Sequence, residues 1–91
     1  MQPHDLIAAS PNAVARNIGG ETVLLHLDSG TYFGLNGVGS FIWSRIEKEP
    51  HSLAALADAV EAEFDVTRDE ALKDITALAQ NLDEQGLLKD N

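Results

Sequence analysis

The chain has 91 residues, a formal net charge of −9 and 44% apolar residues, which is the size and composition of one globular domain. It contains no cysteine, which excludes disulfides, thiolate nucleophiles and cysteine-based metal sites. Residues 47–91 hold twelve acids against four bases, and this acidic field disfavours nucleic acid as a partner. No export signal and no membrane-length apolar run is present, so we expect a cytoplasmic protein with no membrane partner.

The first segment, residues 1–12, contains Pro3 and Pro11 and has no periodic apolar pattern. We expect a flexible N-terminal arm here. The pattern changes at Ala13, and residues 13–91 are therefore predicted to form the folded domain.

Three short extended segments follow the arm. Gly19-Gly20 separates residues 14–18 from residues 22–27, and paired glycines between such runs are typical of a β-hairpin. Asp28-Ser29-Gly30 then predicts a three-residue turn before residues 31–35. With that turn, one side of the sheet is predicted to face the core through Val23, Leu25, Leu27, Phe33 and Leu35. The other side would carry Thr22, Leu24, His26 and Tyr32.

Three helices are predicted after the strands, which gives an α+β fold. Apolar residues recur at helical spacing after Asn36, a candidate N-cap, and this helix should end near Glu49, before Pro50. A second helix should begin at Ser52 and end near Asp65. The third has a capping box, Thr67-Arg-Asp-Glu70, and Gly86 should end it, with Leu87 and Leu88 folding back onto the core.

The sequence carries no pattern typical of catalysis or of cofactor binding. His4, His26 and His51 lie in unlike contexts without converging ligands, so we expect no metal site. The helical carboxylates are predicted to be solvent-exposed, and the glycines near residue 34 lack the spacing of a phosphate-binding loop. We therefore predict no catalytic residues and no cofactors, and a protein that is not an enzyme.

The block ETVLLHLDSGTYFGLN at residues 21–36, followed by GVGSFIW at residues 37–43, resembles the PqqD-like proteins. These are also called precursor-peptide recognition elements, and the resemblance extends over about residues 14–88. It implies a winged-helix-like fold with a three-stranded antiparallel sheet followed by three helices. It also implies that the leader of a ribosomally made precursor peptide pairs with the third strand, beside the third helix. The strand block is most similar to stand-alone members, which favours lasso peptide biosynthesis.

Carried over to this sequence, the resemblance implies a peptide-binding site made of the third strand and one face of the last helix. The strand residues are Thr31, Tyr32, Phe33, Gly34 and Leu35, and the helix residues are Lys73, Asp74, Ile75, Ala77 and Leu78. The implied partners are a precursor (leader) peptide and a biosynthetic enzyme such as a leader peptidase, cyclase or radical enzyme. An acidic chain favours leaders that carry basic residues.

Two other functions stay open at this stage. Three helices beside a small sheet also describe a winged-helix transcriptional regulator, although such a protein normally has a basic recognition helix. An acidic carrier protein is the second alternative, but the Asp28-Ser29 pair lies in a predicted turn and not at a helix start. Which precursor is bound, and whether an uncovered strand edge pairs with a second copy, are open as well.

Overall fold

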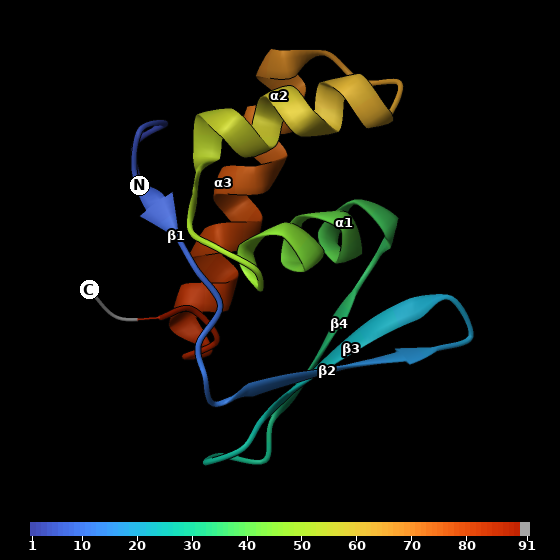
Figure 1. The fold of residues 1–91 in the computed structure, drawn as a ribbon, viewed down its shortest axis with the longest axis vertical. Coiled ribbons are helices and arrows are strands. Elements are labelled where there is room, and N and C mark those ends of the chain that lie inside the picture. Colours follow the sequence, from blue (N-terminus) through green and yellow to red (C-terminus); the bar gives the residue numbers. More distant parts are fainter. Residues whose placement is uncertain (90–91) are drawn as a thin grey trace.

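A three-stranded antiparallel sheet and three helices make up most of the computed structural model, which describes residues 1–89. The sheet has the order β2 (Ala13–Ile18), β3 (Glu21–His26) and β4 (Tyr32–Leu35), and it lies on one side of α1 (Gly37–Ile46) (Figure 1). The helix α2 (Leu53–Glu63) lies on the other side of α1, and α3 (Arg68–Glu84) runs past α1 from the level of α2 to the level of the sheet. The predicted α+β class and the order of sheet and helices are confirmed. Residues 90 and 91 of the predicted domain lie outside the described residues.

The first hairpin forms as the sequence predicts. Ile18 pairs with Glu21, and the two residues between them, Gly19 and Gly20, have φ angles of +60° and +86°. Positive φ at both central positions is the geometry that matches the right-handed twist of the flanking strands, and glycine adopts it at little cost.

The second hairpin differs from the prediction by one residue in register. The structure pairs Leu24 with Phe33 and Leu25 with Tyr32. The loop has four residues, 27–30, because the His26 backbone N–H donates to the Thr31 carbonyl at 2.9 Å. The His26 side chain stabilises this longer loop, since its Nδ1 accepts from the backbone N–H groups of Asp28 and Ser29, both at 3.2 Å.

The shift exchanges the two faces of β3, because successive side chains of a strand point to opposite sides. Leu24 is 0% exposed and Thr22 is 7% exposed, so both face the helices. Val23 and Leu25 lie on the outer face, and Leu27 is 55% exposed in the loop. The prediction that Val23, Leu25 and Leu27 form the core was therefore wrong. Phe33 and Leu35 do face the core, as expected.

The caps of the helices follow the sequence signals. The side chains of Asn36, Ser52 and Thr67 accept from the backbone N–H groups of Gly39, Ala55 and Glu70, at 2.8, 3.0 and 3.3 Å. Gly86 has φ +73° and ends α3, and Leu87 and Leu88 are buried, as predicted. The first helix ends at Ile46, three residues before the expected position near Glu49.

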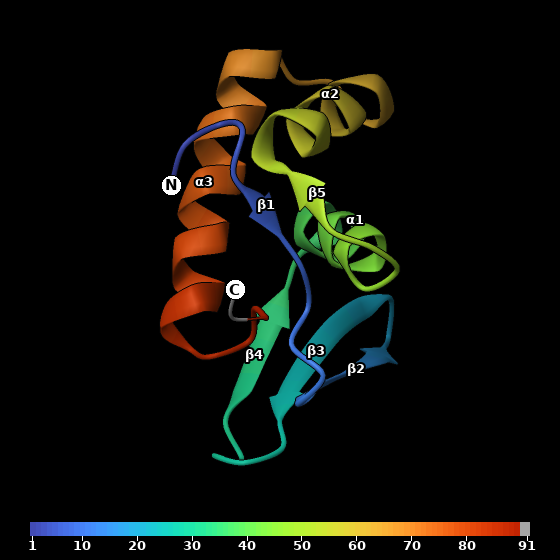
Figure 2. The same cartoon turned by 60° about the vertical axis from the view of Figure 1, so that its left-hand side comes forward.

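The N-terminal segment, expected as a flexible arm, runs along the domain and is hydrogen-bonded to it. Its strand β1 (Leu6–Ile7) pairs with β5 (His51–Ser52), the short strand before α2 (Figure 2). Further along, the Ser10 backbone N–H donates to the Leu87 carbonyl at 2.9 Å. Ile7 is 6% exposed and joins the core. A single buried isoleucine has no periodicity, which is why the sequence did not reveal this contact.

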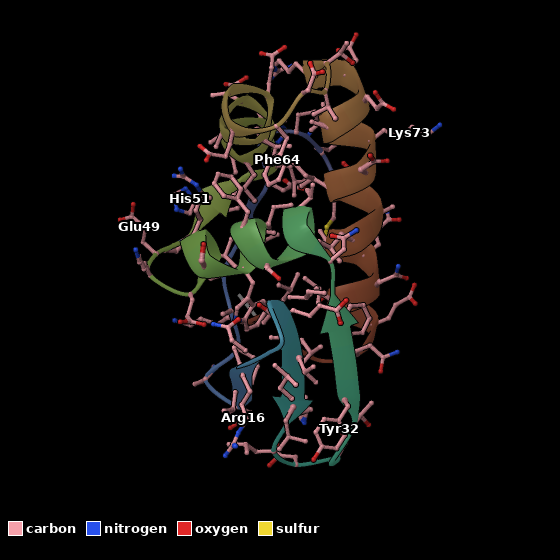
Figure 3. All side chains as sticks on the ribbon, turned by 90° about the vertical axis from the view of Figure 1, so that its right-hand side faces the viewer. Arg16, Tyr32, Glu49, His51, Phe64 and Lys73 are labelled. Carbon is pink, nitrogen blue, oxygen red and sulfur yellow. The ribbon has the colours of Figure 1, made fainter. Side chains whose placement is uncertain are left out.

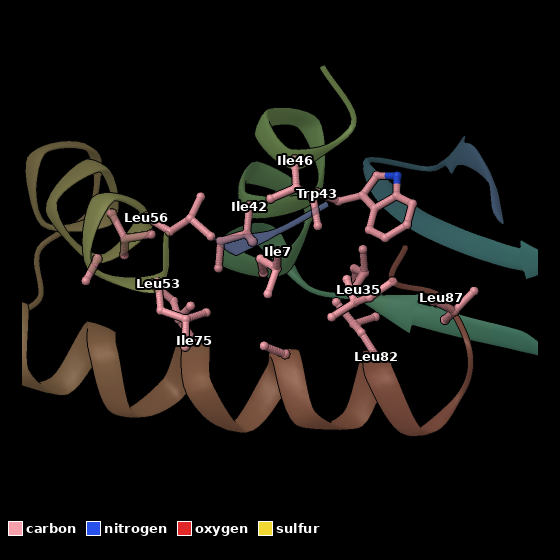
Figure 4. Close-up of a cluster of buried hydrophobic side chains, with 14 of the residues drawn as sticks. Ile7, Leu35, Ile42, Trp43, Ile46, Leu53, Leu56, Ile75, Leu82 and Leu87 are labelled. Atoms are coloured by element: carbon pink, nitrogen blue, oxygen red, sulfur yellow. The ribbon is translucent and has the colours of Figure 1, made fainter. Parts of the chain in front are cut away.

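The core lies where the sheet meets the helices (Figure 4). Leu35, Leu82 and Leu87 cluster at the sheet end, and Leu53, Leu56 and Ile75 lie between α2 and α3. Figure 4 shows Ile7, Ile42 and Ile46 between these two groups. Along the described chain no helix has the length and apolar character needed to cross a membrane.

Candidate functional site

β4 forms one edge of the sheet. Among the described residues its strand neighbour is β3 alone, on one side. Antiparallel partners that exchange backbone hydrogen bonds alternate with partners that do not. Because His26 bonds to Thr31, the bonded pairs continue as Leu24 with Phe33 and Thr22 with Leu35. The N–H and C=O groups of Tyr32 and Gly34 therefore point away from β3 and are free to accept another strand.

The free edge of β4 faces α3, which runs beside it in two views (Figures 2 and 3). The C-terminal end of α3 is held against the sheet at Gly86. A Cβ added to Gly86 would lie 3.1 Å from His26 Nε2, and Gly86 has φ +73°, so a larger residue would crowd His26 and strain the backbone.

A pocket of about 190 Å³ lies at the C-terminal end of β4, between the start of α1 and the middle of α3. It is lined from α1 and its cap by Asn36, Val38, Gly39 and Ile42, and from α3 by Asp74, Ile75 and Leu78. Its walls are mostly apolar and one carboxylate, that of Asp74, is available to a polar or basic group. The pocket is large enough to take a side chain of a strand laid along β4.

The structure brings together most of the predicted site residues. Thr31, Tyr32 and Gly34 are exposed along the edge, whereas Phe33 is half-buried and Leu35 is 4% exposed. On α3, Asp74 and Leu78 reach the pocket, and Ile75, only 1% exposed, forms its floor.

The remaining two predicted helix residues do not line the pocket. Ala77 is exposed on α3, and Lys73 projects into solvent away from β4 (Figure 3). The α1 residues of the pocket were absent from the sequence prediction. Their signal was present in the sequence, since Val38 and Ile42 are four residues apart on one helical face next to the Asn36 cap.

Tyr32 is 70% exposed and lies on the outer face of the sheet, away from α3. It borders a mostly apolar hollow of about 430 Å³, whose other lining residues are Val14, Arg16, Ile18, Val23 and Leu25. A residue of an added strand placed directly beside Tyr32 on this face would lie within contact distance of its ring.

Comparisons with known proteins bear on this edge. The family model described as "Coenzyme PQQ synthesis protein D (PqqD)" matches residues 21–88. A solved structure described as "TbiB1 in Complex with the TbiA(beta) Leader Peptide" has 38% sequence identity and a TM-score of 0.82, covering 92% of this chain and 96% of that chain. A second, "Lasso peptide synthetase B1 complexed with the leader peptide", has 31% identity and a TM-score of 0.80, covering 92% and 98%. No curated protein matches this chain.

Proposed function

Because this chain belongs to the PqqD family, we propose that it binds the leader segment of a ribosomally synthesised precursor peptide and presents the precursor to a modifying enzyme. The leader adds as a fourth strand on the free edge of β4, beside α3, and reaches the pocket between α1 and α3 at the end of that strand. The observation that carries the proposal is the outward direction of the Tyr32 and Gly34 backbone groups at an edge that α3 borders but does not cover.

The length of the edge sets the balance of binding energies. Tyr32 and Gly34 offer two N–H and two C=O groups, and each net hydrogen bond is worth about 0.5–1.5 kcal/mol. Ordering the leader costs about 2–5 kcal/mol, which offsets much of that gain. A micromolar affinity needs about 8 kcal/mol in total, so side chains must supply the rest.

The pocket between α1 and α3 is the place for that side-chain contribution. Its apolar walls suit an apolar or aromatic leader residue, and Asp74 at the wall suits a neighbouring hydroxyl or basic group. Backbone pairing therefore holds the leader in register, and this pocket selects its sequence.

Both structural relatives are described as leader peptide complexes, and one of them is described as a lasso peptide synthetase B1, which directs the proposal toward lasso peptide biosynthesis. In that setting the partner enzyme is the peptidase that removes the leader or the cyclase that acts on the precursor. The role of this chain is binding and not catalysis.

Titration of the isotopically labelled chain with a synthetic leader, taken from the precursor gene beside its own, tests the proposal by NMR. The Tyr32 and Gly34 amides are expected to become protected from hydrogen exchange, and the methyl groups of Leu78 and Val38 to shift. Protection of other amides, with Tyr32 and Gly34 unchanged, would refute leader addition at β4.

A further inference from the structure

The opposite edge of the same sheet carries a second groove, larger than the pocket beside β4. It has a volume of about 540 Å³ and lies between β2 and α1, and Ala9, Ser10 and Pro11 of the N-terminal segment also line it. The wall from β2 includes five consecutive residues, 13–17, so the groove follows the strand backbone and not just one of its faces. The wall from α1 and its C-terminal turn is formed by Ser40, Trp43, Ser44 and Glu47.

The free backbone groups of β2 can be assigned from its pairing with β3. Leu27 N–H donates to the Asn12 carbonyl at 2.9 Å, so bonded pairs recur at Val14, Arg16 and Ile18. The N–H and C=O groups of Ala15 and Asn17 therefore point away from β3. Ala15 also has the smallest side chain that a chiral residue offers, which lets another backbone approach closely.

Two polar atoms of α1 are buried without a hydrogen-bond partner in the described structure, and both belong to residues of this groove. They are Ser40 Oγ and Trp43 Nε1. Residues 40 and 43 are three apart and share one face of α1. Trp43 is 3% exposed, and Figure 4 shows its indole nitrogen at the outer end of the ring, away from the core side chains around Leu35. A buried N–H donor without an acceptor is costly. Because Trp43 Nε1 lies just beneath the groove wall, a small movement of the side chain would bring it to an acceptor bound in the groove.

We propose that this groove binds an extended segment of a second polypeptide, which adds to the β2 edge while the leader occupies the β4 edge. The carbonyl groups of such a segment are the acceptors that Trp43 Nε1 and Ser40 Oγ lack, and its backbone matches the free groups of Ala15 and Asn17. β3 separates the two edges, so both strands can be bound at once. The protein then joins the precursor to a partner protein without chemistry of its own.

Charge favours a separate protein over a second copy of this chain. The groove is close to neutral, with Arg16 and Glu47 as its only charged lining residues among those described. A second copy would bring another net charge of −9, and like charges oppose association. A neutral or basic extended segment has no such penalty.

The test selects random twelve-residue peptides from a display library on the immobilised full chain, and then maps the selected peptides. We expect binders that protect the Ala15 and Asn17 amides from exchange and shift the emission of Trp43, the sole tryptophan. Ala15→Pro removes one outward N–H and should weaken these peptides at least about tenfold, whereas Gly34→Pro should not. Trp43→Phe keeps an aromatic ring but loses the indole donor, and should weaken them about threefold to tenfold.

Ser44→Arg is a second test variant, and it leaves the backbone of the sheet unchanged because Ser44 lies in α1. Ser44 is exposed at the groove wall, so a long side chain there should block the groove without unfolding the protein, as melting curves would show. The inference is overturned if the selection yields no peptide that protects the Ala15 amide. It is also overturned if the selected peptides bind the Ser44→Arg and Ala15→Pro variants with the same affinity as the parent chain. Peptides sensitive to Gly34→Pro alone also overturn it, while leaving leader binding at β4 intact.

Discussion

Leu24 and Leu25 are neighbours in sequence, yet the register of the second hairpin gives them opposite environments. Leu24 is 0% exposed and packs under the helices, whereas Leu25 lies on the outer face opposite Tyr32. Leu24→Ala is expected to lower the free energy of unfolding by about 2–5 kcal/mol, because it removes buried methyl groups and leaves a cavity.

Leu25→Ala is the matched control and should cost less than about 1.5 kcal/mol, since its side chain is only partly removed from water. Urea unfolding of both variants measures the difference. A larger loss for Leu25→Ala would support the three-residue turn that the sequence predicts and would contradict the observed register.

The side chain of His26 explains why the register could not be read from the sequence. Asp28-Ser29-Gly30 is compatible with a three-residue turn, and Gly30 does take the positive φ, +72°, which that reading requires. The longer loop is selected by the bonds from the Asp28 and Ser29 N–H groups to His26 Nδ1. Both readings place apolar residues on each face of β3, so hydrophobic alternation does not decide between them.

At the scale of the elements, the first turn of α1 is tightly packed on one side and open on the other. A Cβ at Gly39 would lie 3.1 Å from Leu35 Cδ2 and 3.3 Å from Asn36 Oδ1, whereas a Cβ at Gly37 meets nothing within 4 Å. Gly37→Ala should therefore raise stability by up to about 1 kcal/mol through helix propensity.

Gly39→Ala should instead lower the stability, because the added methyl group displaces Leu35 or the capping Asn36 side chain. The same substitution also narrows the pocket beside β4, of which Gly39 is a lining residue. Thermal melting of the two variants gives the comparison. Equal shifts of Tm in the same direction would show that α1 does not pack against the end of β4 as described.

The N-terminal segment is the second element whose packing is specific enough to test. Ile7 is 6% exposed, whereas its neighbour Leu6 is 58% exposed. Ile7→Ala should cost about 2–5 kcal/mol of unfolding free energy, and Leu6→Ala less than about 0.5 kcal/mol. Similar, small effects of both substitutions in chemical denaturation would support the flexible arm that the sequence predicts.

The ends of helices and the positions of turns were predicted correctly where a single residue type, such as a capping side chain or a glycine, has one physical role. The caps at Asn36 and Thr67 and the glycines at residues 19, 20 and 86 occur where the sequence places them. Ser52, predicted as the first residue of the second helix, is its N-cap. The features that the sequence did not predict depend on contacts between segments that are far apart in the chain. The pairing of Ile7 with His51 and the approach of Val38 to Leu78 belong to this class.

At the scale of the whole molecule, net charge separates the proposed function from the winged-helix alternative. The chain carries −9, and the first turn of α3 contains Asp69 and Glu70. We expect no shift of random duplex DNA in a gel at low salt, where electrostatic binding is strongest. A retarded band that weakens as salt is added would favour a DNA-binding role.

The negative net charge of the chain should also affect how fast the leader binds. If the leader carries net positive charge, its association rate should fall as ionic strength rises from about 0.01 M to 0.15 M, because salt screens the long-range attraction. The dissociation rate, set by the β4 edge and its pocket, should change little. Stopped-flow measurement of both rates tests this, and a salt-dependent dissociation rate with a constant association rate would contradict it.

The central claim is that the outward backbone groups of β4 hold the leader, and one substitution tests it most directly. Gly34→Pro removes an N–H that points away from β3, at an edge position where proline is tolerated. Calorimetry with the synthetic leader should show affinity reduced at least about tenfold, with Tm close to that of the parent. Ala15→Pro, the equivalent change at the β2 edge, should leave leader affinity unchanged. Full leader affinity in Gly34→Pro would contradict the account.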